Sequence, residues 1–141
     1  MGSEERVTPK IIEEYLRRQK ESFERIDPYT WISIYRGETN SFRVLTHLAK
    51  EWILLTIYPY VSPPKHKENR LALYAQLLEL NHEMNMVKFC IDEQGEVLLS
   101  VEFPTENLDD SEFRDAFQIL SYYADKYYLD ILNLAQDREI N

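Results

Sequence analysis

The chain contains little cysteine and little glycine, and each shortage excludes a class of site. Among its 141 residues Cys90 is the single cysteine, which excludes an internal disulfide and any metal site built from several cysteines. One lone thiol also agrees with a reducing compartment, so we expect a cytoplasmic protein. Only three glycines are present, and neither a GxGxxG pattern nor a Walker loop occurs. A glycine-rich phosphate-binding loop is therefore not expected.

Long apolar runs are also missing. No run approaches the roughly 18 apolar residues that a membrane-spanning helix needs. The N-terminal sequence MGSEERVTPK is charged and lacks the apolar region of a secretory signal peptide. We expect neither a membrane segment nor a signal peptide.

The chain has fewer basic than acidic residues. The chain has 16 basic and 25 acidic residues, which gives a net charge of −9 at pH 7. A protein this acidic is repelled by phosphate backbones, so general binding of DNA or RNA is not expected. The same charge favours solubility.

The chain does have the apolar content of a globular domain. The apolar fraction is 44%, and a chain of this length buries enough surface for a core without disulfides or metals. The simplest organisation is a single domain over residues 8–136, with a disordered N-terminal tail at 1–7 and a C-terminal tail at 137–141.

Helical spacing of apolar residues predicts three helices. Thr8 and Pro9 suit the start of the first, because threonine caps a helix and proline fits its first turn. Asp109 and Glu112 form a similar capping pair before the last. The predicted helices run from about Pro9 to Glu24, Lys67 to Glu83 and Ser111 to Gln136.

Five segments rich in β-forming residues predict five strands, three between the first two helices and two before the last. The proline-rich segment 58–64 is predicted to be a connection without regular structure. The order α-β-β-β-α-β-β-α predicts a two-layer α+β domain with antiparallel pairing within each strand group. The predicted strands are Trp31–Tyr35, Phe42–His47, Trp52–Ile57, Val87–Ile91 and Val97–Phe103.

The acidic segment Asp92-Glu93-Gln94-Gly95-Glu96 separates the last two strands. A calcium loop needs oxygen ligands over about twelve residues, whereas the strand pattern resumes here at once. Asp early and Gly late are typical of a hairpin turn that ends in a left-handed residue. We interpret the segment as a turn and predict no metal site.

This element order and several short segments resemble the YbjN-like family within the type III secretion chaperone-like superfamily. The resemblance covers residues 8–136, and it implies a five-stranded antiparallel sheet with three helices. Proteins of this family are described as regulators, and the secretion chaperones are small, acidic, often dimeric proteins that hold extended segments of a partner. The resemblance supplies no catalytic motif. The segments that carry it are WILLTIYP (52–59), LLELN (77–81), VKF (87–89), Asp92 with GEV (95–97), EFP (102–104), and Leu120 with ADKYY (124–128).

The residues most often used in catalysis form no recognisable motif. His47, His66 and His82 make no HxH, HxxxH or HExxH pair, and Cys90 has no CxxC partner. No basic cluster or helix start adjoins Cys90 in the sequence, so a packed or partly covered thiol is favoured over a nucleophile. The sequence therefore nominates no catalytic residue, no metal ligand and no cofactor.

Aromatic residues are abundant, with ten tyrosines in the chain. One interpretation is that they cover the sheet edges with their hydroxyls in water. The other is a protein-contact surface, because tyrosine and tryptophan concentrate binding energy at interfaces. The partner-binding candidates are Trp31, Tyr35, Tyr58, Tyr60 and Tyr74.

Two hypotheses for function follow. The preferred one is a non-enzymatic binding protein, chaperone-like or regulatory, which captures a protein or peptide segment and forms a homodimer, with the broad apolar face of residues 67–83 available to a second copy. The alternative is a small-molecule-binding or enzymatic domain whose site assembles from scattered residues such as His47, His82 and nearby carboxylates.

Overall fold

A computed structural model describes residues 7–137. Residues 1–6 and 138–141, which make up most of the two expected tails, lie outside the described residues. The elements in chain order are α1 (Pro9–Arg18), β1 (Phe23–Asp27), β2 (Thr30–Arg36), β3 (Ser41–Leu48), β4 (Trp52–Val61), α2 (Lys67–Glu83), β5 (Lys88–Ile91), β6 (Val97–Pro104) and α3 (Asp110–Leu134).

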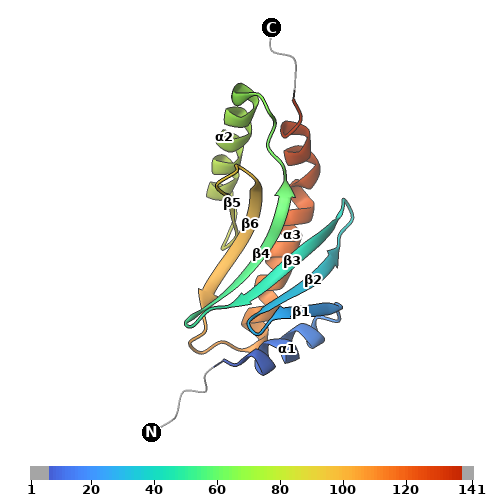
Figure 1. Cartoon of the computed structure of the whole chain (residues 1–141), viewed down its shortest axis with the longest axis vertical. Coiled ribbons are helices and arrows are strands. Elements are labelled where there is room, and N and C mark those ends of the chain that lie inside the picture. Colours follow the sequence, from blue (N-terminus) through green and yellow to red (C-terminus); the bar gives the residue numbers. More distant parts are fainter. Residues whose placement is uncertain (1–6, 138–141) are drawn as a thin grey trace.

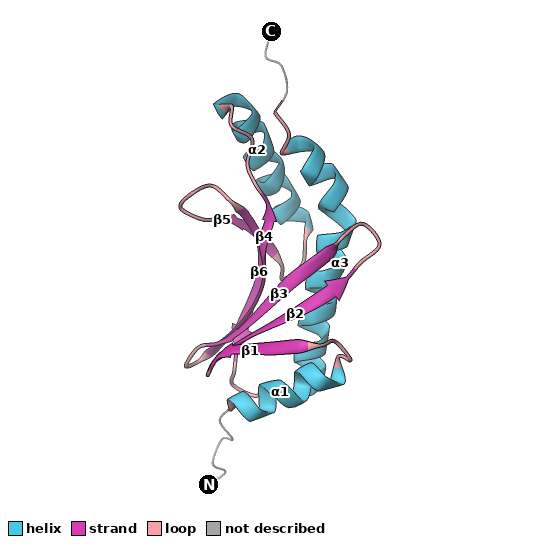
Figure 2. Cartoon of the chain, turned by 45° about the vertical axis from the view of Figure 1, so that its right-hand side comes forward, coloured by secondary structure: helices cyan, strands magenta, loops and turns pink. Residues whose placement is uncertain are grey.

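The strands form one antiparallel sheet in the order β1-β2-β3-β4-β6-β5. The long helix α3 crosses one side of this sheet and packs on β4 and β6, α2 lies beside α3 over β5, and α1 packs near β1 (Figures 1 and 2). The α+β class, the three helices and the antiparallel pairing are as predicted. The strands β1 and β5 are the two edges of the sheet.

The sheet has six strands, so the expectation of five is wrong. The first helix ends at Arg18 instead of near Glu24, and Lys20 just beyond it has a left-handed backbone with φ of 60°. Phe23, assigned to the helix by its spacing, begins the additional strand β1 and pairs with Ser33. The Asp27 carboxylate accepts a hydrogen bond from the Tyr29 N–H at 2.8 Å, which closes the turn from β1 into β2.

The strand β4 is longer than predicted. It continues through Tyr58-Pro59-Tyr60 to Val61, a segment expected to lack regular structure. Its pairing with β6 is interrupted between Ile57 and Val61. The absent N–H of Pro59 is tolerated there, because proline fits a strand where the ladder is interrupted.

Three local predictions are confirmed. The helix α2 runs from Lys67 to Glu83, and α3 is capped by Asp109, whose carboxylate accepts the Glu112 N–H at 2.8 Å. The acidic segment after β5 is a turn: the Asp92 carboxylate accepts two backbone N–H groups, and Gly95 is left-handed with φ of 82°. None of the helices in the described part of the chain has the length and hydrophobicity required to cross a bilayer.

The core lies between the sheet and its helices. Alternate strand residues point toward α3 and α2, and the helices meet them with their own apolar side chains. Fully buried residues from the central strands and α3 include Val44, Ile53, Leu55, Leu99, Phe113 and Leu120.

Candidate functional site

The sheet surface opposite the helices is the first candidate site, and we call it the open face. Side chains alternate along each strand, so the neighbours of the core residues point to this surface. On β4, Ile53 and Leu55 are fully buried, whereas Leu54 between them is only partly covered. No helix or strand of residues 7–137 is laid over this surface in either view (Figures 1 and 2).

The open face carries apolar side chains from β2, β3 and β4 beside polar ones such as Arg43 and His47. Ile32 lies opposite Leu45, and Leu45 lies opposite Thr56 on the next strand. Ile34 is 39% exposed, and Trp52 at the start of β4 is 48% exposed. Surface apolar residues that occur singly are common, but the direct cross-strand pair of Ile32 and Leu45, with further apolar side chains on the same uncovered surface, suggests a contact surface. The apolar residues of the open face are Ile32, Ile34, Leu45, Trp52, Leu54 and Leu98.

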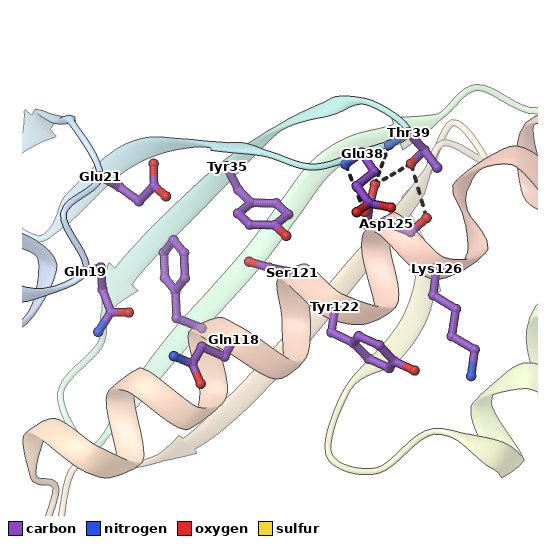
Figure 3. A pocket seen from close by; sticks show the side chains of 11 residues that line it. Gln19, Glu21, Tyr35, Glu38, Thr39, Gln118, Ser121, Tyr122, Asp125 and Lys126 are labelled. Carbon is purple, nitrogen blue, oxygen red and sulfur yellow. Dashed lines mark hydrogen bonds between the residues drawn. The ribbon is translucent and has the colours of Figure 1, made fainter.

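The second candidate site is a cleft of about 670 Å³ on the helix side of the sheet (Figure 3). It is bounded by α3, by Tyr35 near the end of β2, by the hairpin tip between β2 and β3, and by the link from α1 to β1. Its volume is within the range of small-ligand sites.

Asp125 on α3 holds the hairpin wall of this cleft in place. Its carboxylate accepts hydrogen bonds from the backbone N–H groups of Glu38 at 3.0 Å and Thr39 at 2.7 Å, and from the Thr39 hydroxyl (Figure 3). Burial acts to raise the pKa of Asp125, but the hydrogen bonds from Thr39 and Glu38 outweigh it and leave the pKa below its ordinary value. This carboxylate therefore stays ionised near neutral pH.

The Tyr35 hydroxyl lies in a negative environment. Burial raises its pKa, and the nearby carboxylates of Asp125, Glu21 and Glu38 raise it further. Lys126 is the one cation in the lining, and its ammonium lies over the rings of Tyr122 and Tyr127.

The five aromatic candidates from the sequence lie in three different places. Trp31 and Tyr60 are buried in the core. The Trp31 indole donates to Glu13 Oε1 at 3.0 Å, and the Tyr60 hydroxyl donates to the Ala124 carbonyl at 2.7 Å. Neither ring offers a surface to a partner in this structure.

Tyr58 and Tyr74 both hold the turn between β5 and β6. The exposed Tyr58 donates its hydroxyl to the Asp92 carboxylate, and Tyr74 donates to the Gly95 carbonyl at 2.9 Å. The hydrogen bond to Asp92 raises the pKa of Tyr58 and lowers that of Asp92. Tyr35 alone among the five candidates lines the cleft.

The histidines of the alternative hypothesis are not brought together. His47 lies on β3 and shares a 2.8 Å hydrogen bond with Thr30, whereas His82 lies in the last turn of α2, which packs on β5 and α3. Cys90 is on the edge strand β5, and burial raises the pKa of its thiol, with Glu102 adding to the effect. Residues 7–137 contain no group of three or more His, Cys, Asp or Glu side chains arranged to hold a metal.

Sequence reasoning missed most of both sites. The almost continuous apolar run from Trp52 to Ile57 was the available signal for the open face, because such a strand is typical of cover on both faces or of an interface. Ser121 was the available signal for the cleft, because it is a polar residue beside the apolar stripe of α3. Glu21 and Glu38 carry no such signal, since each lies in a connection between elements.

Comparison with known proteins adds a family and a fold. The family model YbjN, described as "Putative bacterial sensory transduction regulator", matches residues 8–133. No curated protein sequence matches the chain.

Two solved structures are similar to this one. A chain of the heterodimeric ExoU–SpcU complex from the type III secretion system of Pseudomonas aeruginosa is 17% identical, with a TM-score of 0.60, over 88% of this chain and 97% of that chain. The crystal structure of YbjN from E. coli is 13% identical, with a TM-score of 0.63, over 86% of this chain and 91% of that chain. At these identities the similarity establishes a shared fold.

Proposed function

The chain belongs to the YbjN family, and we propose that it is a non-enzymatic cytoplasmic protein, chaperone-like or regulatory, that binds an extended segment of a protein partner on the open face. The observation that carries the proposal is the set of apolar side chains on a sheet surface that no helix or strand of residues 7–137 covers. Burial of such side chains against a partner is favourable, at about 25 cal/mol for each Å² of apolar surface removed from water.

The fold relatives support a protein partner. One of them is a chain of a heterodimeric complex, so a protein with this fold associates with a different protein. The family description names a regulator, and a regulator also acts through partners. An extended segment suits the open face, because apolar residues at alternate positions of the segment can meet the apolar side chains that neighbouring strands present there.

A second copy of the chain is a further proposed partner, bound through α2. This helix buries Leu73, Leu77 and Leu80 in the core but leaves Leu71 57% and Leu78 70% exposed on the opposite side. Leu71 and Leu78 are seven residues apart, which is the spacing of a helix–helix contact. We propose that this exposed stripe of α2 forms a homodimer contact.

Affinity capture from the host lysate followed by mass spectrometry tests the open face. We expect the double variant Ile34→Lys/Leu98→Lys to lose at least about tenfold of the captured partner, because two charges are placed in an apolar contact. The matched control is Leu129→Lys, which changes an exposed leucine on α3 and leaves the open face intact.

Circular dichroism and thermal unfolding of each variant establish that its fold is retained. Equal capture by the wild type and a folded open-face variant would contradict the proposal. Loss of the same partner by the Leu129→Lys control would place the contact elsewhere on the surface.

A further inference from the structure

Several of the polar side chains that line the cleft make no polar contact with the rest of the described chain. The Tyr35 hydroxyl, the carboxylates of Glu21 and Glu38 and the amide of Gln118 have no hydrogen-bond or ion-pair partner within residues 7–137, although all four side chains line the cleft. They come from three parts of the chain: the link from α1 to β1, the end of β2 with its hairpin, and α3. Such convergence of unused polar groups on one concavity is typical of a ligand site.

Ser121 provides an independent indication. Its side chain is 3% exposed, and its hydroxyl oxygen is buried without a hydrogen-bond partner. Buried polar groups in proteins are nearly always hydrogen-bonded, so each exception needs an explanation. Figure 3 shows this hydroxyl directed from α3 into the space beside the Tyr35 ring. A ligand that enters this space can form a hydrogen bond with the Ser121 hydroxyl at the inner wall.

The charge of the lining selects the kind of ligand. Three carboxylates, those of Glu21, Glu38 and Asp125, face a single ammonium, that of Lys126. Lys126 lies 5.6 Å and 5.3 Å from the ring centres of Tyr122 and Tyr127, so its charge is directed at these rings. Burial is the main cause of the raised pKa of Tyr35, and the same three carboxylates raise it further. A cation is favoured there and an anion is opposed.

Not all three carboxylates are available for binding. Both oxygens of Asp125 already accept hydrogen bonds from the hairpin tip, so this residue fixes the wall of the cleft. Glu21 and Glu38 remain as acceptors for a ligand, one from each side of the opening.

We propose that this cleft binds a guanidinium group, either of free arginine or a similar small molecule, or of an arginine side chain in a protein segment. A guanidinium carries five N–H donors in one plane, which suits a site where the free groups are mainly acceptors. It is less strongly hydrated than an ammonium and stacks on aromatic rings such as that of Tyr35. Carboxylate pairs with a guanidinium are frequently bidentate.

Isothermal titration calorimetry of the full chain with L-arginine, L-citrulline and the peptide acetyl-Gly-Arg-Gly-amide tests the proposal. Citrulline has nearly the same shape as arginine but no charge. We expect saturable binding of arginine or of the peptide, and no measurable binding of citrulline. Binding of free arginine alone identifies a small-molecule ligand, and binding of the peptide alone identifies a protein segment. Binding of both shows that the guanidinium itself is recognised.

Three variants locate the binding. Glu21→Gln and Glu38→Gln are each expected to weaken binding about tenfold, because each removes one of the two free carboxylates. Ser121→Ala is expected to weaken it several-fold with the net charge unchanged. The control Glu106→Gln makes the same charge change at an exposed residue outside the cleft and is expected to bind like the wild type.

Three results of the calorimetry would overturn the proposal. They are absence of binding by both arginine and the peptide, equal binding of arginine and citrulline, or equal weakening by Glu106→Gln and the two cleft variants. Chemical-shift changes in a parallel ¹H–¹⁵N NMR titration should centre on Tyr35 and Ser121, and changes confined to other surfaces would also overturn it.

Discussion

Asp125 joins α3 to the hairpin between β2 and β3 through hydrogen bonds that all require it to accept. One oxygen receives the Thr39 N–H and hydroxyl, and the other receives the Glu38 N–H. The site is also tight, because a Cβ atom added at Gly37 would lie 2.5 Å from the same carboxylate. The residue therefore sets both the position of the hairpin and one wall of the cleft.

The variant Asp125→Asn should lose stability, because an amide replaces one acceptor oxygen with an NH₂ donor that faces other donors. We expect the free energy of unfolding to fall by about 1–3 kcal/mol, which is the usual cost when a hydrogen-bond partner is removed and a polar group is left unsatisfied. Urea denaturation monitored by circular dichroism measures the change. Asp130→Asn, at an exposed position further along α3, is the control. Equal stability of the two variants would show that the hairpin contact contributes nothing.

At the scale of the element, α2 is apolar around most of its circumference, and its two sides have different surroundings. Leu73 and Leu77 are in the core, whereas Leu71 and Leu78 are exposed. Exposed apolar residues on a helix contribute little to the free energy of folding of a monomer, because they are not buried in it. Their contribution appears when another molecule covers them.

The double variant Leu71→Lys/Leu78→Lys should therefore separate folding from self-association. We expect its free energy of unfolding to stay within about 1 kcal/mol of the wild type under conditions where both are monomeric, because surface substitutions are usually that small. Sedimentation equilibrium should show a dimer for the wild type and for Leu129→Lys, and a monomer for the double variant. A monomeric wild type at every accessible concentration would refute the α2 contact.

The elements predicted correctly from the sequence are those with strong local signals. The cap at Asp109 and the turn at Gly95 are determined by residues within a few positions, and both are as predicted. Phe23 was placed in a helix because it fits the helical spacing as well as the alternation of a strand. Phe23 is in a strand because it pairs with β2, and this contact between elements cannot be predicted from the local sequence pattern.

The same limit applies to the sites. Tyr60 is an aromatic residue in a proline-rich segment, and this context suggested an exposed contact. In the fold its hydroxyl reaches α3, 64 positions along the chain. The cleft joins Glu21, Glu38 and Ser121 from three elements or connections, so its composition becomes visible only once the chain is folded. The almost continuous apolar run of β4, in contrast, is a local signal, and it indicates either cover on both faces or an interface.

At the scale of the whole molecule, two electrostatic effects oppose each other as the pH falls. At pH 7 the net charge is −9, so the excess acidic side chains repel one another in the folded state. This repulsion decreases as the pH approaches the isoelectric point of about 4.8. Several aspartates act in the other direction. Five aspartates accept hydrogen bonds from backbone N–H groups, and these bonds help to lower their pKa below the ordinary value of 3.8. At Asp92 the hydrogen bond from the Tyr58 hydroxyl is the largest cause. The five aspartates are Asp27, Asp92, Asp109, Asp125 and Asp137.

A pKa lowered in the folded state contributes stability above the ordinary value of 3.8, and this contribution is lost as the pH falls through the lower native value. The melting temperature should therefore rise modestly from pH 7 toward the isoelectric point and then fall steeply below 3.8. Added salt at about 0.15 M should raise the melting temperature at pH 7, where it screens the repulsion, and have little effect near the isoelectric point. Thermal unfolding across this pH range at low and moderate salt tests both effects. A melting temperature that falls steadily from pH 7 downward and does not change with salt concentration would contradict this prediction. It would show that repulsion between the acidic side chains is negligible, because they are already well separated in the folded state.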